Sequence, residues 1–207
     1  SLVGSEMCIR DRYKSTKAII DLLDLEGIGV MDGGSRIIEL GTGNVLHRIT
    51  MNPTTLREII TLCLPFGYKM FLNDDLYGAS ITSTDEITEA SEKIFINAVS
   101  HEDALHIIEE LEAIEDITAH QTVSWTDPNK LGIDITHHEG TKQHGAIKLA
   151  EMLDIKKGEI IAIGDGHNDV PLMMAAGYKV AMGNAPKEVQ AIADHVTESV
   201  SNDGVAD

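Results

Sequence analysis

Apolar residues recur at helical spacing in two segments of the first third of the chain, which predicts two amphipathic helices. One follows Ser15 and ends before Gly27, and the other starts at Asn52-Pro53 and is stopped by Pro65. Ser and Asn accept hydrogen bonds from the first N–H groups of a helix, so the flanking residues agree with the spacing. The apolar stripes are Ala18, Ile19, Leu22 and Leu23 in the first helix and Leu56, Ile59, Ile60 and Cys63 in the second.

Shorter apolar runs between turn residues predict strands. Residues 35–51 hold two such runs around a Gly-Thr-Gly-Asn turn at 41–44. Ser100 with Asp103 predicts the capped start of a third helix, which reaches Ile114. The other predicted strands cover residues 68–72, 76–82, 93–99, 116–126 and 131–135.

The stretch EIIAIGDGHNDVPLMMAAGYKVAMG at 159–183 carries the candidate chemistry. Its apolar run at 160–163 is typical of a parallel strand that is buried on both faces, and it stops at Gly164. Ligands bind beyond the carboxyl ends of such strands. Asp165 and Asp169 follow there, and two acids four positions apart can converge on one hard cation. The sequence therefore predicts a Mg²⁺ site, because Mg²⁺ is held by one or two carboxylates together with waters and substrate phosphate.

GDGHND and the following PLMMAAGYKVAMGNAPKEVQAIADHVTES resemble the last motif and C-terminal core of haloacid dehalogenase-like (HAD) phosphatases, in the Cof-type branch. IDITHHEGTKQHGAIKLAEMLDI resembles the segment of that branch in which a lysine opens a helix, which places the lysine at Lys142. The resemblance covers residues 132–207. It implies an α/β fold, with a Rossmann-like core of a parallel sheet between helices and an inserted α+β cap domain.

The resemblance also implies a function and roles for particular residues. The function is Mg²⁺-dependent hydrolysis of small phosphate monoesters, such as sugar phosphates, through an aspartyl-phosphate. Asp165 would hold Mg²⁺, and Asp169 would support the metal site or orient its waters. Lys142 would pair with phosphate oxygens and with the nucleophile, and Asn168 would hydrogen-bond near the transferred group. Phosphoryl transfer depends mostly on such positioning and charge stabilisation.

The nucleophile of the resembled family is an Asp in a DxD motif at a strand end, and no DxD occurs in the 207 residues. Asp11 follows no apolar strand. In the run GIGVMDGGS, Asp32 matches a later turn of the family, near the cap entrance, and is a weak candidate for contacting substrate. We therefore expect a fragment that is inactive alone. Residues 1–12 resemble a translated sequencing-adapter scar, the alternative being a disordered native terminus.

The same reading divides the chain into segments. Residues 13–45 are predicted as an incomplete first part of the core and 46–131 as the cap. Residues 132–207 are predicted as the second part of the core, with the final helix truncated. The Asp-Pro-Asn turn at 127–129 suits the return linker.

Composition limits the classes of partner. The net charge of −18 opposes nucleic acid and anionic membrane surfaces, which attract Lys and Arg clusters. It would also repel a phosphate ester, so the site needs local positive charge. No apolar run approaches the roughly 18 residues that span a bilayer. Cys8 and Cys63 make no disulfide framework, which favours a cytoplasmic location.

Several motifs have simpler interpretations. The turn at 41–44 begins like a dinucleotide fingerprint, but Leu46 stands where Gly is needed. Adjacent histidines are expected to point in different directions, so solvated side chains are favoured over a metal cluster. The Met173-Met174 pair is expected to pack in the core, and Asp74-Asp75 to form a polar turn. The histidines in question are His137, His138 and His144.

Two other functions stay open. The GDGxNDxPxL pattern also occurs in the phosphorylation domain of cation-pumping ATPases, and Val170, Pro171 and Leu172 match it. Such a pump needs transmembrane helices and a DKTGT loop, which this sequence does not contain. A catalytically inactive relative that acts as a binding module is the second alternative, and it predicts that the complete reading frame also lacks DxD.

Overall fold

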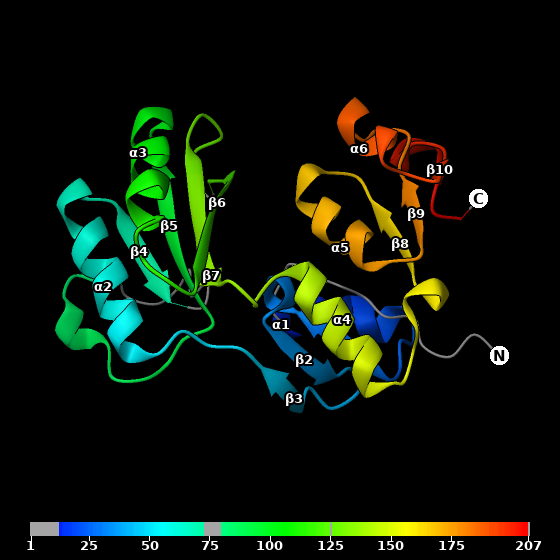
Figure 1. Ribbon diagram of the computed structural model, residues 1–207, viewed down its shortest axis with the longest axis horizontal. Coiled ribbons are helices and arrows are strands. Elements are labelled where there is room, and N and C mark those ends of the chain that lie inside the picture. The colour runs from blue at the N-terminus through cyan, green and yellow to red at the C-terminus, as the bar shows by residue number, and fades with distance from the viewer. Residues whose placement is uncertain (1–12, 73–79, 125, 207) are drawn as a thin grey trace. The chain divides into compact units, whose positions relative to one another are not determined.

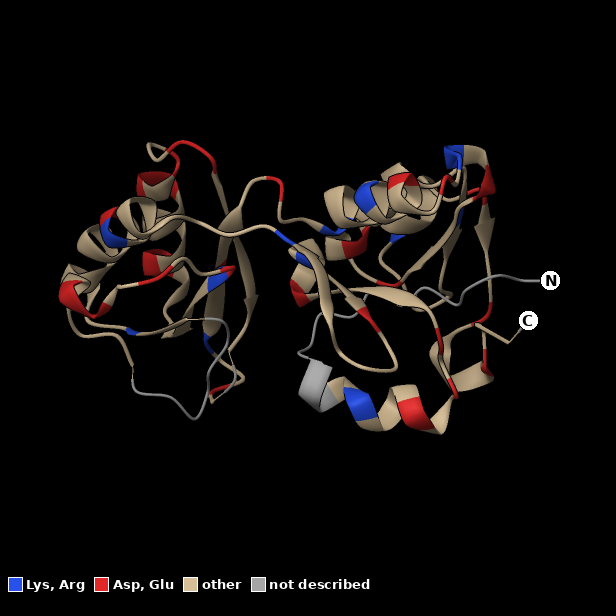
Figure 2. Cartoon of the chain, turned by 90° about the horizontal axis from the view of Figure 1, so that it is seen from below, with Lys and Arg blue, Asp and Glu red and all other residues tan. Residues whose placement is uncertain are grey.

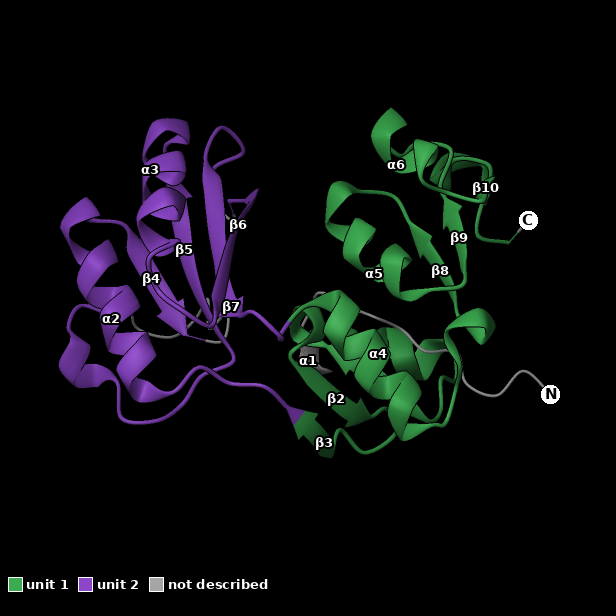
Figure 3. Ribbon diagram, viewed as in Figure 1, with its two compact units in different colours: residues 1–47, 141–207 green, residues 48–140 purple. Residues whose placement is uncertain are grey.

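The computed structural model describes residues 13–72, 80–124 and 126–206. The chain is an α/β protein, and most of its helices and strands are labelled in Figure 1. It divides into two compact units, which Figure 3 colours separately. Unit 1 comprises residues 1–47 and 141–207, and unit 2 comprises residues 48–140, so unit 2 is inserted into the sequence of unit 1.

Unit 2 is a four-stranded sheet with two helices. The helices are α2 (Pro53–Cys63) and α3 (His101–Leu111), and the strands are β4 (Lys69–Leu72), β5 (Lys93–Val99), β6 (Ile117–Val123) and β7 (Leu131–His137). The strand order is β4-β5-β7-β6 and all pairs are antiparallel. One face carries Ile94, Ile96, Ile133 and Ile135, which form a core with Leu56 and Ile107 of the helices.

The other face of this sheet combines charged and aromatic side chains. Lys93 and Asp134 lie there on neighbouring strands, with the ammonium nitrogen 2.7 Å from Oδ1 of the carboxylate. Their side chains are only 10% and 5% exposed. Phe95 is opposite Asp134 in the register and packs across Gly132, where an added Cβ would lie 2.6 Å from the ring. The sheet therefore buries an ion pair on one side and aliphatic side chains on the other.

The predicted helix starts in unit 2 are confirmed. The side chain of Asn52 accepts hydrogen bonds from the N–H groups of Thr54 and Thr55, and Ser100 accepts one from Asp103. The predicted return to the core at residue 132 differs from the structure, because β7 pairs with β5 and β6 inside unit 2. The second boundary between the units lies after Gly140.

Unit 1 holds the remaining elements in two sheets. They are α1 (Tyr13–Leu22), β1 (Ile28–Met31), β2 (Arg36–Glu39), β3 (Val45–Arg48), α4 (Lys142–Met152), β8 (Ile161–Gly164), α5 (Val170–Ala175), β9 (Tyr178–Ala181), α6 (Lys187–Ala191) and β10 (His195–Val196). Helix α1 begins before the expected Ser15. The β1-β2-β3 sheet contains the predicted hairpin turn at 41–44, between β2 and β3. The second sheet, β10-β9-β8, is parallel.

Strand β8 is parallel as predicted, but the expectation that both of its faces are buried is wrong. Ala162 and Gly164 are buried on one face, where Ala162 joins the cluster of Met173 in α5. Ile161 and Ile163 on the opposite face are 66% and 42% exposed. The difference follows from packing, because α5 lies against the face of β8 that carries Ala162, and Ile161 and Ile163 point to the opposite face.

Other expectations have mixed outcomes. Met173 is buried as predicted, whereas Met174 is 48% exposed. Most of the predicted strand at 76–82, together with Asp74-Asp75, Asp11 and Cys8, lies outside the described residues. Within the described part of the chain, every helix is too short or too polar to cross a membrane.

Candidate active site

The loop after β8 is folded around the carboxylate of Asp169. Its Oδ2 atom accepts hydrogen bonds from the backbone N–H groups of Asp165, at 3.1 Å, and Gly166, at 3.2 Å. Gly164 makes room for this arrangement, because a Cβ there would lie 2.7 Å from the Cβ of Asp169. The sequence GDGHND thus encodes a compact turn that fixes the second acid at the carboxyl end of β8.

Helix α4 brings Lys142 to the same place. Thr141 caps this helix by accepting a hydrogen bond from the N–H of His144, so Lys142 is its first residue. The Lys142 ammonium donates to Oδ1 of Asp169. The two side chains are 14% and 13% exposed, which shields their contact from solvent. The structure therefore joins two of the predicted site residues in a partly buried ion pair.

The environment of Asp169 lowers its pKa. Burial alone would raise the pKa of this carboxyl, but the hydrogen bond and charge of Lys142, together with the N–H groups of Asp165 and Gly166, lower it below the usual value. Asp169 is therefore ionised at neutral pH and holds the ammonium in place.

Asp165 and Asn168 are placed differently. Both are exposed residues on the outside of the loop. The Asp165 backbone N–H donates to Asp169, and Asp165 as a residue is exposed. The structure thus brings Lys142 and Asp169 into contact and places Asp165 as an exposed residue of the same loop.

The donor set can be compared with the needs of Mg²⁺. Among the described residues, no three His, Cys, Asp or Glu side chains are grouped closely enough to hold a metal by themselves. Mg²⁺ does not require three, because it keeps several waters and shares substrate phosphate oxygens. Both oxygens of Asp169 already accept hydrogen bonds. The exposed Asp165 therefore fits the metal better as a direct ligand.

The turn after β1 lies against the start of α4. Asp32 has a φ of 52°, its side chain is 11% exposed, and it pairs with Arg36 at 3.3 Å. Gly34, two positions on, is in backbone contact with Thr141, so the turn adjoins the helix that begins with Lys142. The roles of Thr141 and Gly34 in placing this helix were not predicted from the sequence. A Thr directly before the motif lysine was a readable helix-cap signal, whereas the glycine contact is between segments distant in sequence.

The three histidines near this segment do not form a common cluster in the structure. The rings of His137 and His138 stack with their centroids 4.6 Å apart, so the expectation that they diverge is wrong. Nδ1 of His138 lies 3.6 Å from a carboxylate oxygen of Asp116, while His144 contacts the hydroxyl of Thr141.

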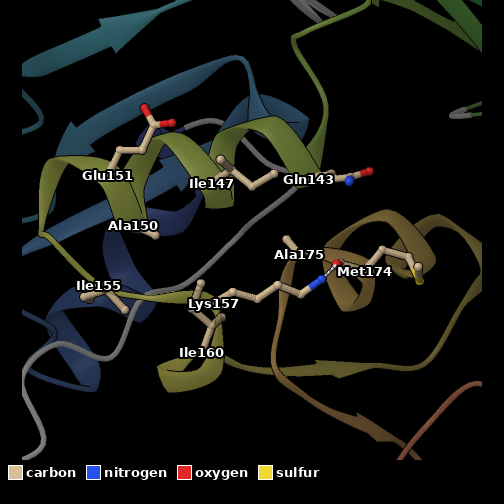
Figure 4. Close-up of a pocket in the computed structure, with 9 residues that line it drawn as sticks. All are labelled: Gln143, Ile147, Ala150, Glu151, Ile155, Lys157, Ile160, Met174 and Ala175. Atoms are coloured by element: carbon tan, nitrogen blue, oxygen red, sulfur yellow. Dashed lines mark hydrogen bonds between the residues drawn. The ribbon is translucent and has the colours of Figure 1, made fainter.

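A pocket of about 330 Å³ lies between α4 and α5 (Figure 4). Lys157 enters it and donates to the carbonyl of Met174 at 2.9 Å. Its lining residues are Gln143, Ile147, Ala150, Glu151, Ile155, Lys157, Ile160, Met174 and Ala175. Lys142, Asp165 and Asp169 are absent from this lining, so the pocket and the candidate site are separate features of unit 1.

A model of the haloacid dehalogenase-like hydrolase family matches residues 11–207. The putative phosphatase YkrA of Bacillus subtilis is 42% identical over 78 residues, a stretch that covers 38% of this chain and 30% of YkrA. This chain therefore aligns with less than a third of that relative's length.

Solved structures show the same fold. A haloacid dehalogenase-like hydrolase from Bacteroides thetaiotaomicron matches with a TM-score of 0.76 at 20% identity, over 95% of this chain and 81% of that one. The subclass IIB sugar phosphatase BT4131 matches with a TM-score of 0.71 at 19% identity, over 91% and 76%. The family match across nearly the whole sequence establishes that this chain belongs to the haloacid dehalogenase-like hydrolase family, and the fold agrees with it.

Proposed function

We propose that this chain is part of a Mg²⁺-dependent phosphomonoester hydrolase that acts on small phosphorylated metabolites, with sugar phosphates as the favoured class. The observation that carries the proposal is the contact of Lys142 with Asp169 at the carboxyl end of β8, in the loop that also holds the exposed Asp165. A fixed cation and an exposed acid on the same loop are an arrangement suited to a phosphate group and a metal ion.

Each residue has a distinct role in this proposal. Lys142 binds phosphate oxygens, and Asp169 holds Lys142 and the loop in place. Asp165 ligates Mg²⁺, which supplies positive charge to the transferred phosphoryl group when bound. Asp169 supports the metal site by fixing the Asp165 backbone. In this proposal only Asp165 is a direct metal ligand. Asn168 hydrogen-bonds to the phosphate or to its waters.

The local positive charge also answers an electrostatic problem. Asp and Glu outnumber Lys and Arg by 34 to 16, and Figure 2 shows acidic residues in both units. A phosphate ester approaches such a surface against repulsion. Asp169 balances the charge of Lys142, so bound Mg²⁺ would supply the net positive charge that the site needs.

The covalent step needs a residue that these 207 positions do not supply in a DxD motif. We propose that an Asp outside this sequence attacks phosphorus, and that a second Asp donates and then accepts the proton. The chain alone is then inactive. Several relatives bear phosphatase names, and the family match includes unit 2, which favours a cap over the nucleotide-binding insert of a cation pump.

The test compares Asp165→Asn with the wild type in the enzyme that contains this chain. Asn keeps the size of the side chain but removes the negative charge that offsets Mg²⁺. We expect nearly unchanged melting temperature and a loss of at least about 10²-fold in Mg²⁺-dependent hydrolysis of an aryl phosphate. A variant within about tenfold of wild type at saturating Mg²⁺ would contradict the metal role.

The 207-residue chain provides a second measurement. Mn²⁺ is a paramagnetic substitute for Mg²⁺, and its binding can be followed by electron paramagnetic resonance without turnover. We expect Asp165→Asn to weaken Mn²⁺ binding, and Asp154→Asn, which changes an acid at the end of α4 away from the site, to leave it unchanged. Equal weakening by both variants would indicate general electrostatics and no defined site.

A further inference from the structure

The position of Lys142 is set by the start of helix α4. This lysine is the first residue of α4, and it follows the boundary between the units by one residue. The hydrogen bond from the Gly145 N–H to the Thr141 carbonyl, 2.9 Å long, closes the first turn of this helix. Contacts that hold the first turn of α4 in place therefore also position the Lys142 ammonium against Asp169.

Two glycines meet at this turn. Gly34, after β1, has a φ of +116°, and a Cβ there would lie 2.0 Å from the carbonyl oxygen of Thr141 and 2.6 Å from the backbone nitrogen of Lys142. Gly145 faces it from the helix. A Cβ at Gly145 would lie 2.6 Å from a methyl carbon of Val30 and 2.8 Å from the carbonyl oxygen of Gly34.

The contact is therefore between two backbones with no side chain between them. Both glycines are buried. Glycine is a poor residue for a helix interior, so helix propensity does not explain Gly145. Close approach does, because alanine at either position would push the turn and the helix apart. The atoms nearest to the two added Cβ positions are mostly backbone atoms, which cannot rotate away as a flexible side chain can.

From this geometry we infer that the contact of Gly34 with Gly145 is a positioning device for Lys142, which holds the ammonium at the distance from Asp169 that phosphate binding requires. This rests on the proposed function only in its last step. Neither glycine touches substrate, and both act through Lys142. A misplacement of about 1 Å at a reacting group can lower the rate by roughly 10²-fold, so small shifts of α4 matter.

The primary test is Gly145→Ala, with Gly158→Ala as the matched control. Gly158 has no atom within 4 Å of an added Cβ and no positive φ, so alanine there adds the same methyl group without a clash. The readout is labelling of lysines by an amine-reactive reagent, followed residue by residue by mass spectrometry. Lys148 in the same helix is 43% exposed and serves as the internal reference.

We expect Gly145→Ala to raise the labelling of Lys142 several-fold relative to Lys148, because the displaced helix start withdraws the ammonium from Asp169. Gly158→Ala should leave the ratio at its wild-type value. A merely structural role would raise both lysines together through general unfolding. An unchanged ratio in a folded Gly145→Ala protein would overturn the inference.

If Gly145→Ala does not fold, Gly34→Ala tests the same contact from the other side, because its added Cβ would lie 2.0 Å from the Thr141 carbonyl oxygen. This variant should also raise the labelling of Lys142 relative to Lys148. A ratio equal to that of the wild type would count against the inference. Gly33→Ala is the control for Gly34→Ala within the turn. Both glycines have positive φ, but an added Cβ at Gly33 meets nothing within 4 Å, so only the change at Gly34 should affect Lys142.

Turnover separates this inference from the proposed function. In the active enzyme, Gly145→Ala should lower kcat more than it changes KM. If Lys142→Ala itself left turnover unchanged, the proposed function would fail, whereas the labelling ratio would still report whether the glycine contact positions the lysine.

Discussion

The ammonium of Lys142 donates to one carboxylate oxygen of Asp169, although the two residues are 27 positions apart in sequence. The other oxygen of Asp169 accepts from two backbone N–H groups of the loop after β8. One carboxylate thus ties a helix start to a strand end, and charge-assisted hydrogen bonds of this kind are among the stronger ones in proteins.

The first prediction concerns Lys142→Met, which removes the cation and keeps most of the apolar stem. We expect kcat/KM for an aryl phosphate to fall by about 10²- to 10³-fold in the active enzyme, since one preorganised charge contact to the phosphoryl group is lost. Lys148→Met, on the same helix and exposed, is the control and should retain the wild-type rate. Similar rates for both variants would remove Lys142 from the mechanism.

The second prediction concerns pH. The pKa of the Asp169 carboxyl is lowered in the folded protein, so its contribution to stability is present above the unfolded pKa of about 3.9 and is lost as pH falls through the folded value. Lys142→Met removes the main partner that lowers the pKa of Asp169. In metal-free buffer, the difference in urea midpoint between wild type and Lys142→Met should therefore be largest near neutral pH and shrink below pH about 4. A difference that stays constant down to pH about 3 would argue against this pairing.

The third prediction concerns Cys63. Burial raises the pKa of its thiol to about 12, and the side chain is 2% exposed in the core of unit 2. The thiolate is the reactive form, so alkylation by iodoacetamide at pH about 8 should be slow in the folded protein. Urea should increase the rate steeply at the unfolding midpoint of unit 2. Rapid modification without denaturant would show that this core opens readily.

The fourth prediction concerns the buried pair of Lys93 and Asp134. Lys93→Met leaves a buried carboxylate without its nearest cation, and such single replacements cost about 3–5 kcal/mol. The double variant with Asp134→Leu removes both charges and should recover most of that loss. Urea unfolding of wild type, both single variants and the double variant gives the coupling free energy. A double variant that is less stable than either single one would show that the pair acts through other partners.

Much of the local structure was readable from the residues. Asn52-Pro53 and Ser100 mark helix starts because their side-chain oxygens accept hydrogen bonds from adjacent N–H groups, an effect confined to a few positions. The glycines at 41 and 43 likewise predicted the hairpin turn. These signals are local, so they survive without knowledge of the rest of the fold.

Pairing between distant segments was not readable in the same way. The alternation of Ile133, Asp134 and Ile135 is that of a strand with one apolar face, but it does not specify which sheet the strand joins. Strand β7 therefore appeared to belong to the core until its antiparallel register with β5 and β6 was seen. The family resemblance assigned Lys142 and Asp169 to one site, but their direct contact was seen only in the structure, since no spacing rule relates residues 27 positions apart.

The open edge of strand β8 has a consequence for the self-association of this protein in solution. Its outer edge is followed by no other strand among the described residues, and Ile161 and Ile163 are exposed beside that edge. Such an edge can template pairing with another molecule, whereas the net charge of −18 keeps molecules apart. Added salt screens the repulsion and leaves the apolar edge unchanged. Concentrated solutions should therefore scatter little light at low ionic strength, and the scattering from aggregates should increase as salt is added.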